Sequence, residues 1–181
     1  AAVAVSDVVI VIVPVMLTSE KEADLTVIES IARILAKSLQ RNAMVSFETT
    51  LPIGVTRKLG AIIETGGLKA GMDFDLVFSP ERVKSRLVMK HLLQNPKIVG
   101  GITPKSAARA EAFYGKYLGA PVINVGTLEA AELSKLAGML YRDVNIALAN
   151  ELANYAQRAG IDFASVRDAA NTDGEAALLV P

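Results

Sequence analysis

The chain has 181 residues, 51% of them hydrophobic, which is enough to form one packed core. It carries 19 basic and 19 acidic residues and has no block of like charges, so the clustered positive charge that nucleic-acid binding needs is missing. Cys is absent and His91 is the single histidine, which excludes disulfides and thiol nucleophiles and disfavours a histidine-based metal site or a Ser-His-Asp triad.

The first predicted strand covers residues 8–13, which are very apolar and end at Pro14. This run is too short to span a bilayer and lacks the basic region of a signal peptide, so it reads as a buried parallel strand. We therefore expect a cytoplasmic protein without a membrane partner. Ser19 and Glu22 form a capping-box pattern ahead of a helix whose apolar stripe extends over 25–39.

Strands and helices then continue to alternate. Four more strands are predicted, at residues 43–47, 76–78, 98–101 and 121–125. Helices are predicted over 55–66, as a short piece within 84–95, and over 104–119, where Thr103 and Pro104 mark the start. This order is typical of an α/β fold whose strands are joined by crossover helices, and it predicts a parallel, Rossmann-like sheet.

The pattern changes near residue 127. Leucines at spacings of three and four indicate one helix over 127–160, far longer than the average globular helix, and a shorter helix follows over 163–171. A helix of this length usually extends beyond one domain or builds a dimer interface. We therefore predict two parts, an α/β part over 1–126 and a helical region over 127–181.

Thr50 is the first candidate for a chemical role. It follows the strand at 43–47 and precedes Pro52 and Gly54, where a helix is expected to begin. A helix start offers free amides and a positive dipole end, which suit a phosphate, a nicotinamide amide or a bound water. The alternative is that Thr50 merely caps this helix.

Glu81 and Lys135 are the other candidates. Glu81 follows the strand at 76–78 and could act as a general base or orient a water, or it could be a surface residue paired with Arg82. Lys135 could stabilise an oxyanion, or it could form a solvated pair with Glu132. Because the carboxyl ends of parallel strands form the ligand crevice, the hydroxyl, the carboxylate and the ammonium are expected to converge there.

Taken together, these motifs resemble the UDP-glucose/GDP-mannose dehydrogenase family, in the family's order and over nearly the whole chain. The matching stretches are residues 6–14, 48–54, 79–83, 95–101, 129–135, 141–145 and 150–152. The Pro-Glu-Arg-Val and Tyr-Arg-Asp-Val-Asn runs look closer to the branch that oxidises UDP-N-acetylmannosamine or UDP-N-acetylglucosamine.

The resemblance implies NAD-dependent oxidation of the C6 alcohol of a UDP-sugar to the carboxylate. Residues 1–126 would be the second part of the NAD-binding domain. Three residues would be catalytic. Thr50 would hold a water, Glu81 would do acid/base work, and Lys135 would stabilise an oxyanion. Pro14 would contact NAD together with Thr50 and Glu81. The resemblance also implies a homodimer formed through the helix at 127–160. No metal is expected, because the chain has no cysteine and a single histidine.

Three features depart from the family pattern. Met139 stands where the family has an asparagine, the glycine fingerprint G-x-G-x-x-G is missing, and no cysteine is present to form the thioester. We therefore expect a central piece of such an enzyme that is inactive by itself. The alternative is a non-catalytic module for dimerisation or nucleotide binding.

Overall fold

The computed structural model describes residues 2–83 and 86–181. Its contacts divide the chain into two compact units, Ala1–Lys135 and Leu136–Pro181. The division falls inside the long helix that the sequence predicts, whereas the domain limit expected from the sequence lies at 126/127. Each unit is described below by itself.

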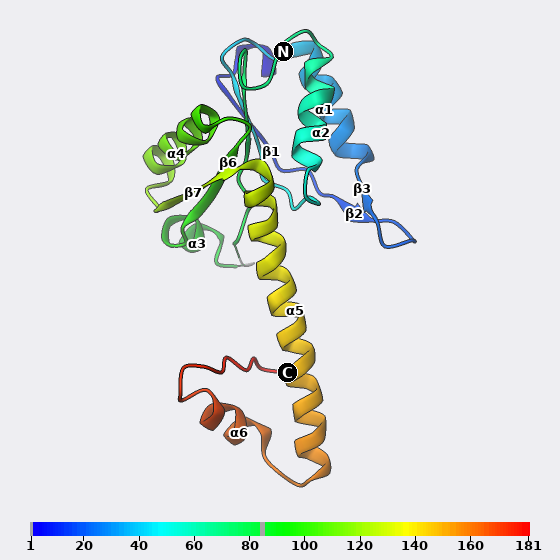
Figure 1. Cartoon of the computed structure of the whole chain (residues 1–181), viewed down its shortest axis with the longest axis vertical. Helices are drawn as coiled ribbons and strands as arrows, with labels where there is room; N and C mark the ends of the chain where they lie inside the picture. Colours follow the sequence, from blue (N-terminus) through cyan, green and yellow to red (C-terminus); the bar gives the residue numbers. More distant parts are fainter. Residues whose placement is uncertain (1, 84–85) are drawn as a thin grey trace. The chain divides into compact units, whose positions relative to one another are not determined.

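The first unit is built on a five-stranded sheet with the order β1-β4-β5-β6-β7 (Figure 1). Its strands are β1 (Val8–Val11), β4 (Met44–Phe47), β5 (Asp75–Phe78), β6 (Lys97–Gly101) and β7 (Val122–Thr127). The remaining elements up to the long helix are η1 (Val3–Val5), β2 (Met16–Leu17), β3 (Ala23–Asp24), α1 (Thr26–Ser38), α2 (Val55–Glu64), α3 (Val88–Gln94) and α4 (Pro104–Leu118).

The two faces of the sheet carry separate apolar clusters. On β4, Val45 and Phe47 pack with α1, α2 and the first turn of the long helix, whereas Met44 packs with α4 on the opposite face. This alternation follows from the period of two along a strand, and all four residues of β4 and of β5 are buried. Figure 1 shows α1 and α2 side by side and α4 apart from them.

The α/β fold class is confirmed, with one correction to the direction of the strands. β1, β4 and β5 are parallel, but β6 is antiparallel to β5, with Val77 opposite Gly101 and Phe78 opposite Gly100. For two strands to be parallel, the connection between them must carry the chain back to the end of the sheet at which the first strand began. The segment between β5 and β6 instead stays at the end where β5 finished, so β6 begins there.

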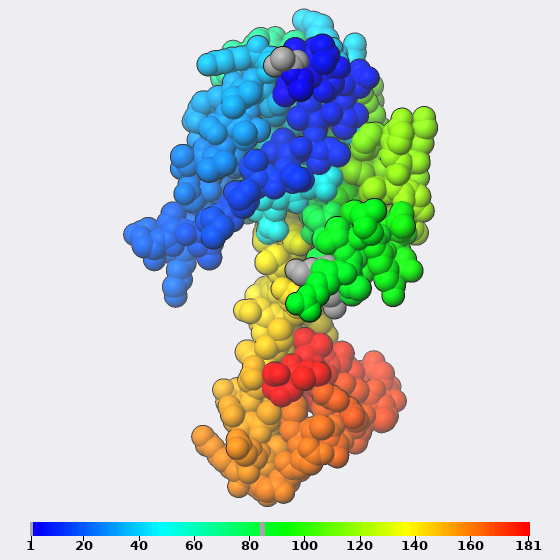
Figure 2. All heavy atoms as spheres, turned by 180° about the vertical axis from the view of Figure 1, so that it is seen from behind, coloured from blue at the N-terminus to red at the C-terminus, as the bar shows by residue number. Residues whose placement is uncertain are grey.

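The predicted capping box at Ser19 and Glu22 is wrong. The segment instead forms the β2–β3 hairpin, which projects from the first unit (blue, Figure 2). Thr18 closes its turn, because the amide of Thr18 donates to the carbonyl of Glu22 and the amide of Glu22 donates to Thr18 Oγ1. α1 begins only at Thr26, whose amide donates to Asp24 Oδ1.

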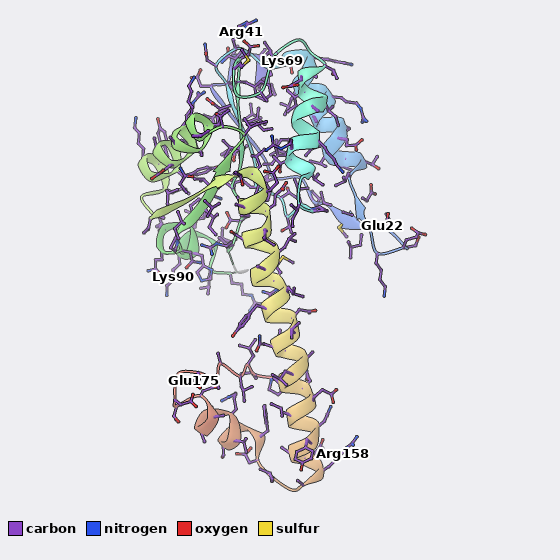
Figure 3. The ribbon with its side chains drawn as sticks, in the orientation of Figure 1. Glu22, Arg41, Lys69, Lys90, Arg158 and Glu175 are labelled. Atoms are coloured by element: carbon purple, nitrogen blue, oxygen red, sulfur yellow. The ribbon has the colours of Figure 1, made fainter. Side chains whose placement is uncertain are left out.

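The other helices largely follow the sequence. As predicted, Thr103 caps α4, with its Oγ1 accepting from the amide of Ser106, and the helix ends at Gly119, which has a positive φ. α3 lies within the stretch 84–95 for which a short helix is expected, and residues 84 and 85 are outside the described residues. Figure 3 labels Lys90 on α3, and Arg41 and Lys69 near the amino ends of β4 and β5.

The predicted long helix is confirmed as α5 (Leu128–Arg158), which begins in the first unit and continues into the second. α6 (Phe163–Ala170) follows and is capped by Asp162, whose carboxylate accepts from the amides of Ala164 and Ser165. Within the described ranges, no helix combines the length and the apolar character that crossing a membrane requires.

Candidate functional site

A cavity of about 640 Å³ lies in the first unit where β1, β4 and β5 end and β6 begins. All four residues singled out in the sequence line it, namely Pro14, Thr50, Glu81 and Lys135. The first three follow the carboxyl ends of parallel strands, which meet at one edge of the sheet. Their expected convergence is therefore observed, while their chemical roles stay predictions.

The loop after β4 is fixed from two sides. Thr49 Oγ1 donates to the carbonyl of Val13 at 2.6 Å, which joins this loop to the end of β1. Gly54 has a φ of 83°, a left-handed conformation in which a side chain would be strained, and α2 begins at the next residue. Thr50 lies between these two points, lines the cavity and does not cap α2, so the capping interpretation is wrong.

The first turn of α2 is occupied by a carboxylate from α5. Glu132 is fully buried and accepts from the amides of Gly54, at 2.6 Å, and Thr56, at 2.8 Å. The sequence-based alternative of a solvated Glu132–Lys135 pair is therefore wrong. Because Glu132 takes these amides, the start of α2 is not an open site for a phosphate, which corrects the expectation made for this loop.

An ion pair supports the same junction. The guanidinium of Arg57 on α2 donates twice to the carboxylate of Glu129, at 2.6 and 3.2 Å. These hydrogen bonds raise the pKa of Arg57 and lower the pKa of Glu129. Because the pKa of Glu129 is lower in the folded state, the stability that this pair contributes is present at pH values above the unfolded pKa of the carboxyl group. It is lost as the pH falls through the folded pKa. Both side chains are at least one-third exposed, so the pair contributes about 1 kcal/mol or less.

Glu81 is held through both its main chain and its side chain. Its carbonyl accepts from Lys135 Nζ, and its amide donates to the carbonyl of Glu48 at 3.1 Å. One carboxylate oxygen accepts from the amide of Arg82 at 2.6 Å, whereas the Arg82 guanidinium donates to the carbonyl of Pro96. The side chain of Glu81 is 35% exposed, so its carboxylate is accessible from the cavity.

A buried polar network that the sequence analysis missed lies next to Glu81. Lys97 Nζ donates to Glu48 Oε2 at 2.7 Å and lies 3.4 Å from Glu81 Oε2. Tyr114 from α4 donates its hydroxyl to Glu48 Oε1 at 2.6 Å and lies 2.8 Å from Ser46 Oγ. A buried charge is tolerated when it is paired and hydrogen-bonded, and each group here has such partners.

The sequence did contain a signal for this network. Lys97 stands at the start of a strand and Glu48 at the end of another, both next to apolar runs in which charged residues are uncommon. If β6 were parallel to β4 and β5, these two positions would lie at opposite ends of the strands. Only the antiparallel direction of β6 brings them together.

The network predicts unusual titration of Tyr114. Burial, together with the negative charge and the hydrogen bond of Glu48, raises the pKa of Tyr114. We expect its tyrosinate absorbance to develop well above the ordinary tyrosine pKa of about 10. Because the folded pKa is raised, the associated stability is present below about pH 10 and is lost as pH rises. The difference between the alkaline absorbance titrations of the parent chain and Tyr114→Phe measures this, and a normal titration of Tyr114 would contradict the network.

Sequence profiles of two related domains match the chain. Residues 1–118 match the NAD binding domain of the UDP-glucose/GDP-mannose dehydrogenase family, and residues 129–180 match the central domain of the same family. The chain belongs to this family. The resemblance inferred from the motifs is therefore confirmed, and NAD is the cofactor of the domain that residues 1–118 match.

Individual members of the family agree with this assignment. The UDP-N-acetyl-D-mannosamine dehydrogenase of Pyrococcus horikoshii is 34% identical over 97% of this chain and 42% of that protein. The NDP-N-acetyl-D-galactosaminuronic acid dehydrogenase of Ralstonia solanacearum is 32% identical over 97% of this chain and 43% of its own length. The solved structure of a UDP-D-ManNAc dehydrogenase from Pyrococcus horikoshii has a TM-score of 0.92 at 34% identity, over 98% of this chain and 42% of that one. The chain thus spans less than half the length of these relatives.

The cavity fits the nicotinamide end of NAD better than its pyrophosphate. Its lining includes the apolar residues Ile12, Val13 and Pro14 together with polar groups such as Thr50, and this combination suits a flat ring carrying an amide. A pyrophosphate usually binds at a glycine-rich turn and a free helix start. The sequence has no G-x-G-x-x-G, and Glu132 fills the start of α2.

Proposed function

We propose that this chain carries the acid/base and oxyanion-stabilising groups of an NAD-dependent nucleotide-sugar 6-dehydrogenase. The convergence of Thr50, Glu81 and Lys135 on one cavity supports the proposal. The substrate proposed is a UDP-linked N-acetyl amino sugar, because a relative named UDP-N-acetyl-D-mannosamine dehydrogenase aligns with nearly the whole chain. The product is the corresponding uronic acid.

Each of the three residues has a distinct role in this proposal. The carboxylate of Glu81 exchanges protons with the reacting C6 oxygen or with a water. The ammonium of Lys135 stabilises negative charge that develops on that oxygen, and its hydrogen bond to the Glu81 carbonyl places it at the cavity wall. The hydroxyl of Thr50 holds the water. Bound NAD supplies the hydride acceptor.

The second oxidation requires a group that these 181 residues do not contain. Covalent capture of the aldehyde as a thioester needs a thiol, and the chain has no cysteine. The chain by itself is therefore expected to show no turnover. Met139 is a further departure, since a thioether cannot donate a hydrogen bond to an oxyanion.

The test compares the protein isolated from its source with the pure 181-residue chain. NADH formation is followed with UDP-N-acetylmannosamine, UDP-N-acetylgalactosamine and UDP-glucose. We expect the source protein to have more than twice the 19.2 kDa mass of this chain and to prefer an N-acetyl amino sugar. Turnover by the pure chain would overturn the thiol-dependent mechanism, and inactivity of the source protein with all three sugars would overturn the proposed function.

We also propose that α5 forms a homodimer interface. Such an interface does not depend on catalysis, so the chain could form it even if it is inactive. Leu133, Leu140, Val144 and Leu148 recur at helical spacing, and all are between 45% and 65% exposed. Apolar side chains grouped on one helix face commonly mark an interface. Leu140 and Leu148 are therefore not core residues in this chain, and charged substitutions there are usable probes.

Light scattering on the 181-residue chain tests the interface. We expect a dimer at micromolar concentration for the parent chain and a monomer for Leu140→Glu, because a carboxylate is costly to bury. Gln157→Glu places the same charge off this face of α5 and should remain dimeric. A monomeric parent chain, or a dimeric Leu140→Glu variant, would rule out this interface.

A further inference from the structure

Lys97 is a buried cation to which the proposed chemistry assigns no role. Its side chain is 6% exposed, and its amide donates to the carbonyl of Pro121 at 2.8 Å, which fixes the start of β6. The ammonium lies at the cavity edge between two carboxylates, Glu48 at 2.7 Å and Glu81 at 3.4 Å.

Stability alone does not account for the pair formed by Lys97 and Glu48. The cost of removing two charges from water commonly cancels their attraction, and apolar side chains of similar volume often replace such pairs without loss. What an apolar pair cannot do is present a positive charge to a third group. In this site the third group is the carboxylate of Glu81, which is accessible from the cavity.

The partners of Lys97 hold it in one place. Glu48 is itself fixed by the hydroxyl of Tyr114, and the ring of Tyr114 lies beneath the ammonium, with its centroid 5.0 Å from Nζ. Lys135 contacts the carbonyl of Glu81, so the two lysines act on different parts of the same residue. Lys97 acts on its side chain and Lys135 on its main chain.

We propose that Lys97 is a positioning residue that orients the carboxylate of Glu81 toward the cavity, with Glu48 and Tyr114 holding Lys97 in place. Its effect on catalysis rests on the proposed function, because it matters only if Glu81 performs acid/base chemistry. The effect on the geometry of Glu81 does not depend on any activity, so the two can be tested separately.

The geometric test uses side-chain NMR of Glu81 in the 181-residue chain labelled at glutamate. We expect one ordered side-chain conformation in the parent chain, rotamer averaging in Lys97→Met, and recovery of the ordered signal in Lys97→Arg. Lys58→Met removes an exposed lysine on α2 and should leave the signal unchanged. An ordered, unshifted Glu81 signal in folded Lys97→Met would overturn the proposal.

A second variant covers the case in which Lys97→Met does not fold because Glu48 is left unpaired. The double variant Glu48→Gln/Lys97→Met removes both charges and keeps an acceptor for the hydroxyl of Tyr114. We expect it to fold and to show the same averaging of Glu81. A fixed Glu81 in this variant would show that Lys97 does not orient it.

The functional test uses the complete dehydrogenase and separates kcat from KM. Because a misplacement of about 1 Å can lower a rate by about 100-fold, we expect kcat to fall by about 10- to 100-fold in Lys97→Met, with KM for the UDP-sugar nearly unchanged. Lys97→Arg should recover most of the loss. A kcat within about twofold of the parent enzyme in Lys97→Met would overturn the positioning role. An inactive parent enzyme would overturn the proposed function, and the NMR result would still decide the geometry.

Discussion

Replacing Glu132 by alanine is expected to lower the free energy of unfolding of the first unit by about 3 kcal/mol. The change removes a fully buried carboxylate that accepts from the amides of Gly54 and Thr56. Two donors then remain without an acceptor in the protein interior, and the positive end of α2 loses its counter-charge. Urea unfolding of the 181-residue chain measures the loss.

Two further variants separate the hydrogen bonds from the charge. Glu132→Gln keeps an acceptor oxygen but not the charge, so its loss of stability should fall between those of the parent chain and the alanine variant. Glu151→Ala removes an exposed glutamate from the same helix and should change stability by less than about 0.5 kcal/mol. Faster hydrogen exchange at the amides of Gly54 and Thr56 should accompany the loss in Glu132→Ala. Unchanged exchange there would show that Glu132 does not cap α2.

Glu132 also connects the first turns of α5 to the candidate site. Its carboxylate fixes the end of the loop that contains Thr50, and Lys135, one turn later, contacts the carbonyl of Glu81. One short stretch of helix therefore holds both strand-end loops that line the cavity. We expect Glu132→Ala to displace Thr50 as well as to destabilise α2.

The sequence predicted those parts of the fold that local patterns determine. The apolar run at β1 and the helical spacing along α5 need no knowledge of the tertiary structure. The convergence of Thr50 and Glu81 also followed, because parallel strands bring their carboxyl ends to one edge of the sheet. These predictions rested on periodicity and on one general rule of α/β sheets.

The parts that could not be predicted depend on contacts between distant segments. The direction of β6 is set by where the chain returns after β5, and without that direction the contact between Lys97 and Glu48 could not be predicted. Glu132 resembled one half of a surface ion pair until the start of α2 was placed against it. The turn at Thr18 matched a helix start because both use the same capping residue types.

Glu81→Gln is expected to lower kcat of the complete dehydrogenase by about 10²- to 10⁴-fold, the range associated with removal of a general acid or base. The substitution keeps the size of the side chain and its acceptor for the amide of Arg82, so the loop should stay folded. What is lost is a group that can exchange a proton at the cavity. Steady-state kinetics with NAD and the preferred UDP-sugar measure the change.

The position of Glu81 makes this prediction specific. Glu48 is also close to the cavity, but its side chain is only 9% exposed, against 35% for Glu81, and both of its carboxylate oxygens accept short hydrogen bonds from Lys97 and Tyr114. Glu81 is the more accessible carboxylate, so it is better placed to reach a substrate. Glu64→Gln, whose parent residue pairs with Lys69 away from the cavity, should keep full activity. If Glu81→Gln retained the parent kcat, the proton acceptor would have to be another group, and a fixed orientation of Glu81 by Lys97 would have no catalytic consequence.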